Sequence, residues 1–179
     1  VTTGRAGSRS YLLVQRYDRL AHDGGWRRLH QETFAQALGK PTGEAPTLAE
    51  VLSLTRQVMC APDVLGLIDG CIFNVLMCNP AADACNFSLL LAQDGARLAP
   101  IHGITCVAKW NGASPKLGRM IAGEHIDWPQ WKAFAAECGL NPARLLARVE
   151  SLAVAVLAHV REAAATVSAM PAGPHPLTP

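Results

Sequence analysis

Residues 73–90 read FNVLMCNPAADACNFSLL and connect an apolar helical pattern to a predicted β-hairpin. Pro80 prevents a simple continuation of the preceding helix. Beyond it, the β-compatible runs 87–91 and 97–101 flank an Asp-Gly turn, a strong hairpin signal. The segment is therefore predicted to be a loop between a buried helix and a hairpin. The apolar stripe of that helix consists of Val64, Leu65, Ile68, Ile72, Val75 and Leu76.

Upstream of this segment the sequence predicts a strand and two helices. Residues 11–14 (YLLV) form a short apolar run typical of a strand. Over residues 30–38 apolar side chains fall on one helical face, and Gly39 follows as a C-cap. Thr47 and Glu50 match a capping box that begins a helix ending near residue 59, after a loop.

Downstream, two more helices are expected to begin after Asp127 and Asn141. Residues 171–179 hold four prolines in nine positions and are predicted to be a disordered tail, which leaves residues 1–170 as one domain. The fold class is therefore predicted as α+β, mainly α. We expect a helical bundle that holds one short β-hairpin and follows an N-terminal strand.

Composition excludes several classes of protein. Half of the 179 residues are hydrophobic and 17% are charged, so the chain is not disordered throughout. A formal net charge of +2 is too small to predict nucleic-acid binding, and the arginines near the N-terminus are interpreted as a solvated face. No secretory signal is visible and no stretch is apolar enough to span a bilayer, so we expect a cytoplasmic protein without a membrane partner.

The six cysteines contain no C-x-x-C pair. Cys71, Cys78 and Cys85 recur every seven residues, but no histidine lies among them. We interpret them as buried free thiols and not as a metal site.

The loop at residues 79–86 is the segment that could carry chemistry. Phosphoryl transfer needs a carboxylate to accept the proton of the nucleophile, and oxygen ligands that hold magnesium on the phosphates. Kinase-like enzymes place a base aspartate first, a magnesium-binding asparagine five residues later, and a second metal-binding aspartate beyond. In isolation, Asn86 more often makes a turn hydrogen bond than binds a metal ion.

Four stretches, in this order, resemble the HipA family of bacterial serine/threonine kinases, the toxins of toxin–antitoxin pairs. The resemblance runs from about Leu12 to about Glu124. Residues 13–19 (LVQRYDR) look like the hinge strand that holds adenine, and 28–39 (RLHQETFAQALG) look like RLHQEDFCQALG. Residues 73–90 resemble FNxLxGNTDAHAKNFSLL, and 98–103 (LAPIHG) look like LAPLYD. The resemblance implies a protein-kinase-like C-terminal lobe, ATP and magnesium as cofactors, and an antitoxin-like protein partner.

The chain departs from the family pattern at the positions of the catalytic and metal-binding residues. The base aspartate of the family falls on Ala81 and its metal-binding aspartate on Gly103. Asp83 and Cys85 replace the histidine and lysine of the loop, and Asp83 is at best a weak substitute for the base. Asn86 alone is retained, as a weak metal ligand. With Gln15 and Tyr17 of the hinge-like stretch, Asn86 completes the candidate cofactor-binding set.

These departures predict a pseudokinase that acts as a binding or scaffold module, with ATP and magnesium binding weak or absent. The alternative is an active HipA-type kinase whose N-lobe is supplied by a separate chain, because the phosphate-binding loop of the family lies upstream of the hinge-like stretch. A remnant without a selected function is a third interpretation. From the resemblance we expect an antitoxin-like protein partner. From the small net charge we expect no direct contact with nucleic acid.

Overall fold

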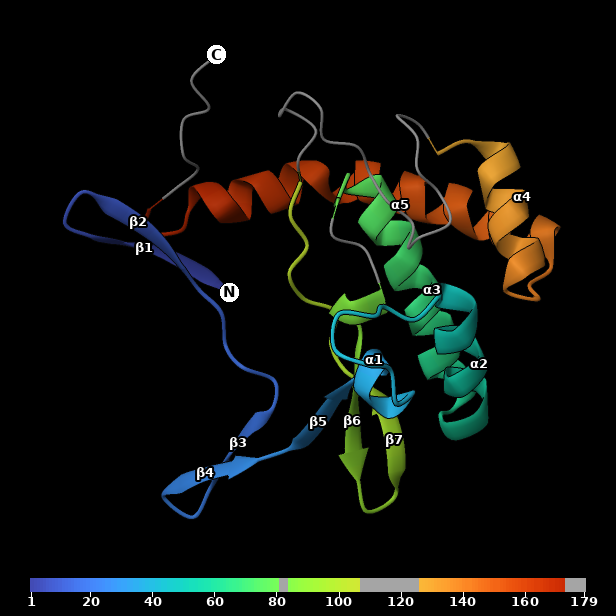
Figure 1. Cartoon of the computed structure of the whole chain (residues 1–179). Coiled ribbons are helices and arrows are strands. Elements are labelled where there is room, and N and C mark those ends of the chain that lie inside the picture. Colours follow the sequence, from blue (N-terminus) through green and yellow to red (C-terminus); the bar gives the residue numbers. More distant parts are fainter. Residues whose placement is uncertain (81–83, 107–125, 173–179) are drawn as a thin grey trace. The chain divides into compact units, whose positions relative to one another are not determined.

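A computed structural model describes residues 1–80, 84–106 and 126–172 (Figure 1). In chain order the elements are β1 (Thr2–Ala6), β2 (Arg9–Leu13), β3 (Arg19–His22), β4 (Gly25–Arg28), β5 (His30–Thr33), α1 (Phe34–Ala37), α2 (Leu48–Val58), α3 (Ala61–Leu76), a single 3-10 turn η1 (Ala84–Asn86), β6 (Ser88–Ala92), β7 (Gly95–Leu98), α4 (Trp128–Glu137) and α5 (Pro142–Ser168). The chain divides into two compact units, residues 1–17 with 153–179 and residues 18–152, and each is described by itself.

In the first unit, β1 and β2 pair antiparallel, from Thr2 opposite Leu13 to Ala6 opposite Arg9. Every residue of β2 is exposed. The predicted tail is described only at its first two residues, where the Ala172 amide donates a hydrogen bond of 3.3 Å to Thr3 Oγ1. Its remaining residues lie outside the described part of the chain.

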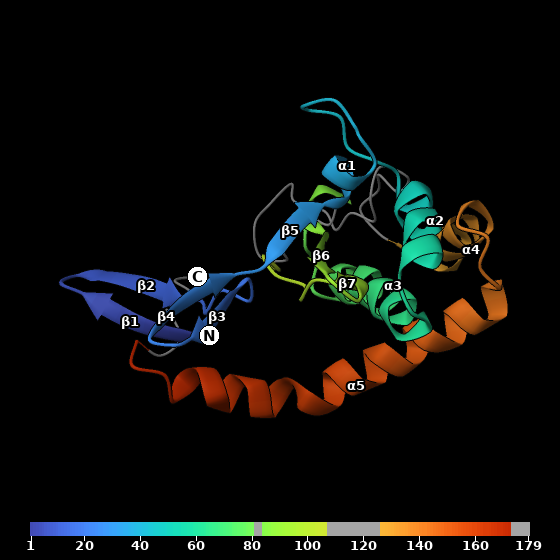
Figure 2. The same cartoon turned by 90° about the horizontal axis from the view of Figure 1, so that it is seen from below.

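The second unit contains a three-stranded antiparallel sheet in the order β5-β6-β7. β5 pairs with β6 from Thr33 opposite Ser88, and β6 pairs with β7 from Leu89 opposite Leu98. The helices α2 and α3 pack against each other, and α3 also packs against β7 (Figures 1 and 2). The core between these elements is closed by fully buried side chains, among them Phe34, Leu52, Leu67, Ile72 and Phe134.

Local sequence signals placed most helices and the hairpin correctly. Thr47 Oγ1 accepts a hydrogen bond from the Glu50 amide at 3.2 Å, and Glu50 Oε2 accepts one from the Thr47 amide at 2.8 Å, which confirms the capping box at the start of α2. Pro62 lies in the first turn of α3, and the predicted hairpin is β6–β7. The last two helices begin immediately after Asp127 and Asn141, and α5 is the longest helix among the described residues.

The predicted helix over residues 30–38 is wrong in its first half. Residues 30–33 form β5, and only Phe34–Ala37 are helical. The reason is tertiary, because β6 supplies hydrogen-bond partners to β5 and burial of Phe34 fixes the turn that follows. Thr33 then caps α1, with its hydroxyl accepting from the Gln36 amide at 3.2 Å.

The prediction of a single hairpin is also wrong, because β1–β2 and β3–β4 are hairpins as well. In the β3–β4 turn, Asp23 and Gly24 adopt positive φ values of 44° and 77°. Two consecutive residues with positive φ match the twist of a two-residue hairpin turn. The flanking strands were missed because RLAH and GWRR lack apolar alternation. The fold is thus a mixed α/β structure with several small antiparallel sheets.

The acidic member of the α2 cap makes the stability of the fold depend on pH. The hydrogen bond from Lys40 Nζ, 2.6 Å from Glu50 Oε1, and then the Thr47 amide lower the pKa of Glu50 to about 2. Glu50→Gln keeps a capping acceptor but removes the charge, so it should lower the melting temperature at pH 7. The difference should persist above the unfolded pKa of about 4.3 and disappear as the pH falls towards 2, because the carboxylate itself then becomes protonated.

Thermal denaturation followed by circular dichroism from pH 7 to pH 2 measures this difference. Glu150→Gln is the matched control, since Glu150 is exposed on α5 and makes no ion pair within the described residues. A difference between wild type and Glu50→Gln that does not change with pH would contradict the assigned role of the charge.

Candidate functional site

Two buried asparagines hold the beginning of the loop that follows α3. Asn74 lies in the last turn of α3 and is 3% exposed, and Asn79 lies beyond the helix and is 2% exposed. Asn79 Nδ2 donates to Asn74 Oδ1 at 2.6 Å, and Asn74 Nδ2 donates to the Gly70 carbonyl at 2.8 Å. The Asn79 amide also donates to the Asn74 carbonyl at 2.9 Å. The first loop residue is therefore fixed to the helix through both side chain and backbone.

Between the two asparagines the chain reverses at Cys78, whose φ of 52° lies in the left-handed region. Its amide donates to the Val75 carbonyl at 2.9 Å, which closes the end of α3. A side chain in this conformation costs about 1–2 kcal/mol. The family pattern given above has glycine at this position, so the backbone bend is kept here with a residue that is less suited to it.

The other end of the loop is tied to the sheet. Phe87, which is 3% exposed, follows η1, and its carbonyl accepts from the Phe34 amide at 3.2 Å. The Ala99 amide donates to the Ser88 carbonyl at 2.9 Å, and Gln31 Nε2 donates to Ser88 Oγ at 3.3 Å. Three stretches, 30–34, 87–91 and 98–99, therefore run beside one another at the open end of the β6–β7 hairpin.

The structure describes two of the predicted site positions, one before β6 and one after β7. Asn86 ends η1 and is exposed. Gly103 follows β7 with a φ of 70°, and nothing lies within 4 Å of the place where its Cβ would be. Ala81 and Asp83, the base position and its weak substitute, lie outside the described residues. His102 is exposed, with Nδ1 3.2 Å from the Pro100 carbonyl oxygen.

Gln15 and Tyr17 belong to the first unit, whereas Asn86 belongs to the second. The structure therefore does not relate the hinge-like residues to the loop. Gln15 is exposed, and it follows β2 instead of lying within a strand. Asp18, which had no predicted role, is 5% exposed, forms an ion pair with Arg19, and accepts a hydrogen bond from the Leu29 amide at 2.9 Å through its carbonyl.

The described residues do not fit a magnesium site. Magnesium in phosphoryl-transfer enzymes is held by one or two carboxylates in addition to phosphate oxygens and water. Among the side chains that the structure describes, no group of three or more His, Cys, Asp and Glu could hold a metal ion. At the described family positions the chain offers the amide of Asn86 and, at Gly103, no side-chain ligand.

Two of the described cysteines, Cys71 and Cys138, are buried free thiols. Cys71 is 1% exposed, and burial, with Cys138 nearby, raises the pKa of its thiol well above the usual range. Burial likewise raises the pKa of Cys138 to about 12. Cys71 is thus a buried free thiol as expected, whereas Cys78 is only half-buried and the side chain of Cys85 lies outside the described residues.

The buried Asn74–Asn79 pair was not singled out from the sequence. Two asparagines five residues apart across the end of a helix are a weak signal in isolation. Their positions within the FN…N pattern of the 73–90 stretch could have identified them. Only the fold shows that these two side chains bond to each other.

Comparison with known proteins agrees with this geometry. Residues 1–160 match the model of the HipA-like C-terminal domain, and the chain belongs to this family. A protein of Sinorhizobium fredii (strain NBRC 101917 / NGR234) named "Putative kinase Y4mE" is 34% identical over 160 residues, which cover 82% of this chain and 38% of that protein.

Among solved structures, the Shewanella oneidensis MR-1 toxin–antitoxin system of HipA, HipB and operator DNA contains a similar chain. The TM-score is 0.69 at 22% identity, over 82% of this chain and 40% of the other. This likeness shows a shared HipA-like fold. The present chain spans about two fifths of the length of both proteins. No helix among the described residues is long and apolar enough to cross a membrane.

The asparagine pair should be energetically coupled. Asn74→Ala and Asn79→Ala should each lower the free energy of unfolding by about 1–3 kcal/mol, because each removes the buried hydrogen bond between Asn79 Nδ2 and Asn74 Oδ1. The double variant should lose less than the sum, by about 1–2 kcal/mol. Urea denaturation of the four proteins measures the cycle, and Gln57→Ala, on the exposed face of α2, serves as the control. Strictly additive losses would show that the two side chains do not act as a pair.

Proposed function

We propose that this domain is a pseudokinase, a HipA-like module that binds a partner and does not transfer phosphate. The observation that carries the proposal is the contrast between the loop framework and its chemistry. The Asn74–Asn79 pair and the hydrogen bonds of Ser88 and Phe87 hold the loop at both ends. The two aspartates expected by resemblance are replaced by Ala81 and Gly103.

The expected cost of these replacements is large. A positioned base typically contributes about 10²–10⁴-fold to a rate. A metal ion contributes further by neutralising charge on the phosphates as it develops. Alanine and glycine supply neither function, and a single asparagine side chain cannot replace the charge of two carboxylates. ATP and magnesium are therefore expected to bind weakly or not at all.

The partner that we favour is an antitoxin-like protein in the cytoplasm. The support is the solved HipA chain of similar fold, whose structure is titled as a complex with HipB and operator DNA. A formal net charge of +2 gives no reason to propose direct binding of nucleic acid by this chain. Binding of such a partner would require the folded surface of the domain and would not require ATP or magnesium in the active site.

A second candidate function is an active serine/threonine kinase completed by another chain. The observation that favours it is coverage, because this chain spans only 38% of the Sinorhizobium protein. Even in that arrangement Ala81 and Gly103 would supply no carboxylate, so we rank it second. Phosphoryl transfer that appears only on mixing with a chain carrying a nucleotide-binding lobe would support this function.

The first test is ATP binding by isothermal titration calorimetry, with and without magnesium, on the complete 179-residue chain. We expect no magnesium-dependent binding up to millimolar ATP, and no incorporation of radiolabelled phosphate above background. A magnesium-dependent dissociation constant in the micromolar range, together with phosphoryl transfer, would overturn the proposal.

A pair of matched variants tests whether the two positions are what the chain lacks. Ala81→Asp with Gly103→Asp should tighten ATP binding in magnesium at least about ten-fold relative to Ala81→Asn with Gly103→Asn, which has nearly the same shape without the charge. Asp and Asn both tolerate the positive φ at residue 103, and there is room for a side chain there. Equal binding by the two double variants would mean that other parts of the site are missing.

A further inference from the structure

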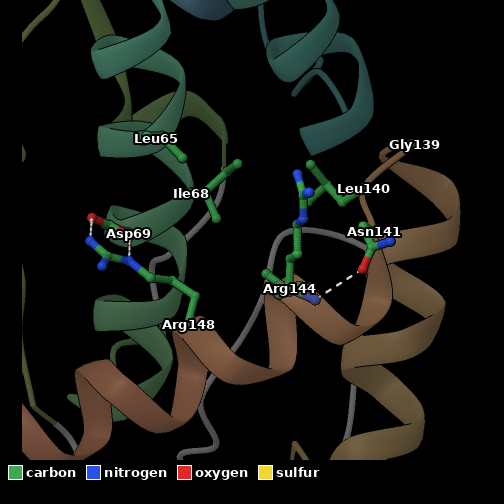
Figure 3. A pocket seen from close by; sticks show the side chains of 9 residues that line it. Leu65, Ile68, Asp69, Gly139, Leu140, Asn141, Arg144 and Arg148 are labelled. Atoms are coloured by element: carbon green, nitrogen blue, oxygen red, sulfur yellow. Dashed lines mark hydrogen bonds and ion pairs between the residues drawn. The ribbon is translucent and has the colours of Figure 1, made fainter.

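An open cavity of about 320 Å³ lies in the second unit between α3 and the beginning of α5 (Figure 3). Its walls are mostly apolar. Leu65, which is 59% exposed, and Ile68 line it from α3, and Leu140 and Leu145 line it from the α4–α5 connection and α5. The cavity is near the lower end of the 300–1,000 Å³ range of small-molecule sites.

The polar groups of the cavity are Asp69, Arg144, Arg148 and Asn141. Arg148 is fully engaged by Asp69, with Nε 2.7 Å from Oδ1 and a terminal nitrogen 2.5 Å from Oδ2. This two-bond fork occupies both carboxylate oxygens and neutralises the charge of Asp69. The negative charge of Asp69 is therefore already paired with Arg148 and is not paired with Arg144.

Among the described residues that line the cavity, Arg144 is the arginine that has no acidic partner. Its side chain is exposed and makes no ion pair or hydrogen bond within the described ranges of the chain. Figure 3 shows it beside Leu140, facing Leu65 and Ile68 across the cavity, while Arg148 turns away to Asp69. An unpaired guanidinium on an apolar wall combines a fixed positive charge with a surface that favours hydrocarbon.

The backbone adds to this charge without being a site in itself. Arg144 lies in the first turn of α5, where its amide donates to Asn141 Oδ1 at 3.0 Å. The first turn of α5 holds no acidic residue. The positive end of the helix dipole is therefore not offset locally, and it reinforces the charge of Arg144.

We propose that this cavity binds a small monocarboxylate with an apolar body. The carboxylate pairs with the guanidinium fork of Arg144, whose geometry suits two parallel hydrogen bonds. The apolar body lies against Leu65, Ile68 and Leu140. A dianion such as phosphate fits less well, because among the described lining residues only Arg144 has a positive charge that no carboxylate neutralises.

The test uses three probes of equal chain length and different head group: octanoate, octanol and octylammonium. Binding to the complete chain is followed by isothermal titration calorimetry and by amide chemical shifts. Octanoate should bind with one site and at least about ten-fold more tightly than octylammonium, with octanol between them. Inorganic phosphate should bind more weakly than octanoate.

Two variants assign the contacts. Arg144→Gln should weaken octanoate binding about ten-fold and leave octanol binding unchanged, since only the head group loses its partner. Arg161→Gln is the matched control, because Arg161 is an exposed arginine of α5 that does not line the cavity. Leu65→Ser should weaken octanoate and octanol alike. Because Leu65 is exposed, this variant should keep the fold, which a thermal melt checks.

The proposal is overturned if octanoate shows no saturable binding at 5 mM, or if octylammonium binds as tightly as octanoate. It is also overturned if Arg144→Gln and Arg161→Gln weaken octanoate binding to the same extent. The proposal is overturned as well if octanoate changes the amide chemical shifts only of residues that do not line the cavity.

Discussion

The hydrogen bond from Asn79 to Asn74 joins the end of α3 to the loop that precedes β6, and the geometry of the site depends on it. Both side chains are almost completely buried, so the amide groups must find their partners within the protein. Leaving such a group without a partner costs about 1–3 kcal/mol, a large share of the stability of a small domain. The contact also requires the reversed backbone at Cys78, which the chain tolerates despite its strain.

On the other side of this loop the sheet holds the chain. Phe87 is buried, and the neighbouring Ser88 pairs with Thr33 across β5–β6. The residues that flank the loop are therefore fixed, and Asn86 lies directly before the second fixed segment. These contacts are made by amides and backbone groups, so they do not depend on the two aspartates of the family pattern, which Ala81 and Gly103 replace. The contacts at the two ends of the loop can therefore persist in a domain that lacks these carboxylates.

The parts of the fold that were predictable are those with local causes. The capping box of Thr47 and Glu50, the proline in the first turn of α3 and the Asp-Gly hairpin turn each act within a few residues, and each is found where the sequence placed it. Residues 30–33 were assigned to a helix because their period was compatible with one. The pairing partner that makes them a strand, β6, lies more than 50 residues away, and no local pattern reveals it.

The family could be recognised from four ordered stretches, and the match over residues 1–160 bears this out. The replacement of the two family aspartates by Ala81 and Gly103 could be predicted position by position from those stretches, and the loss of catalysis stays a prediction. The Asn74–Asn79 contact and the ion pair between Arg148 and Asp69 could not be predicted, because both depend on which side chains meet after folding. Gln15 and Tyr17 remain predictions, since they and Asn86 belong to different units of the chain.

The central claim is that the contacts on both sides of the loop between α3 and β6 persist in a domain that, as proposed above, does not hold a divalent metal ion. Paramagnetic broadening of backbone amide signals by Mn²⁺ tests it most directly, because Mn²⁺ occupies magnesium sites and broadens nearby signals at low occupancy. The account predicts that the amides of Asn86 and Gly103 remain sharp and dispersed at sub-millimolar Mn²⁺, with and without ATP. Selective broadening of these two amides at micromolar Mn²⁺, reversed by excess Mg²⁺, would contradict it.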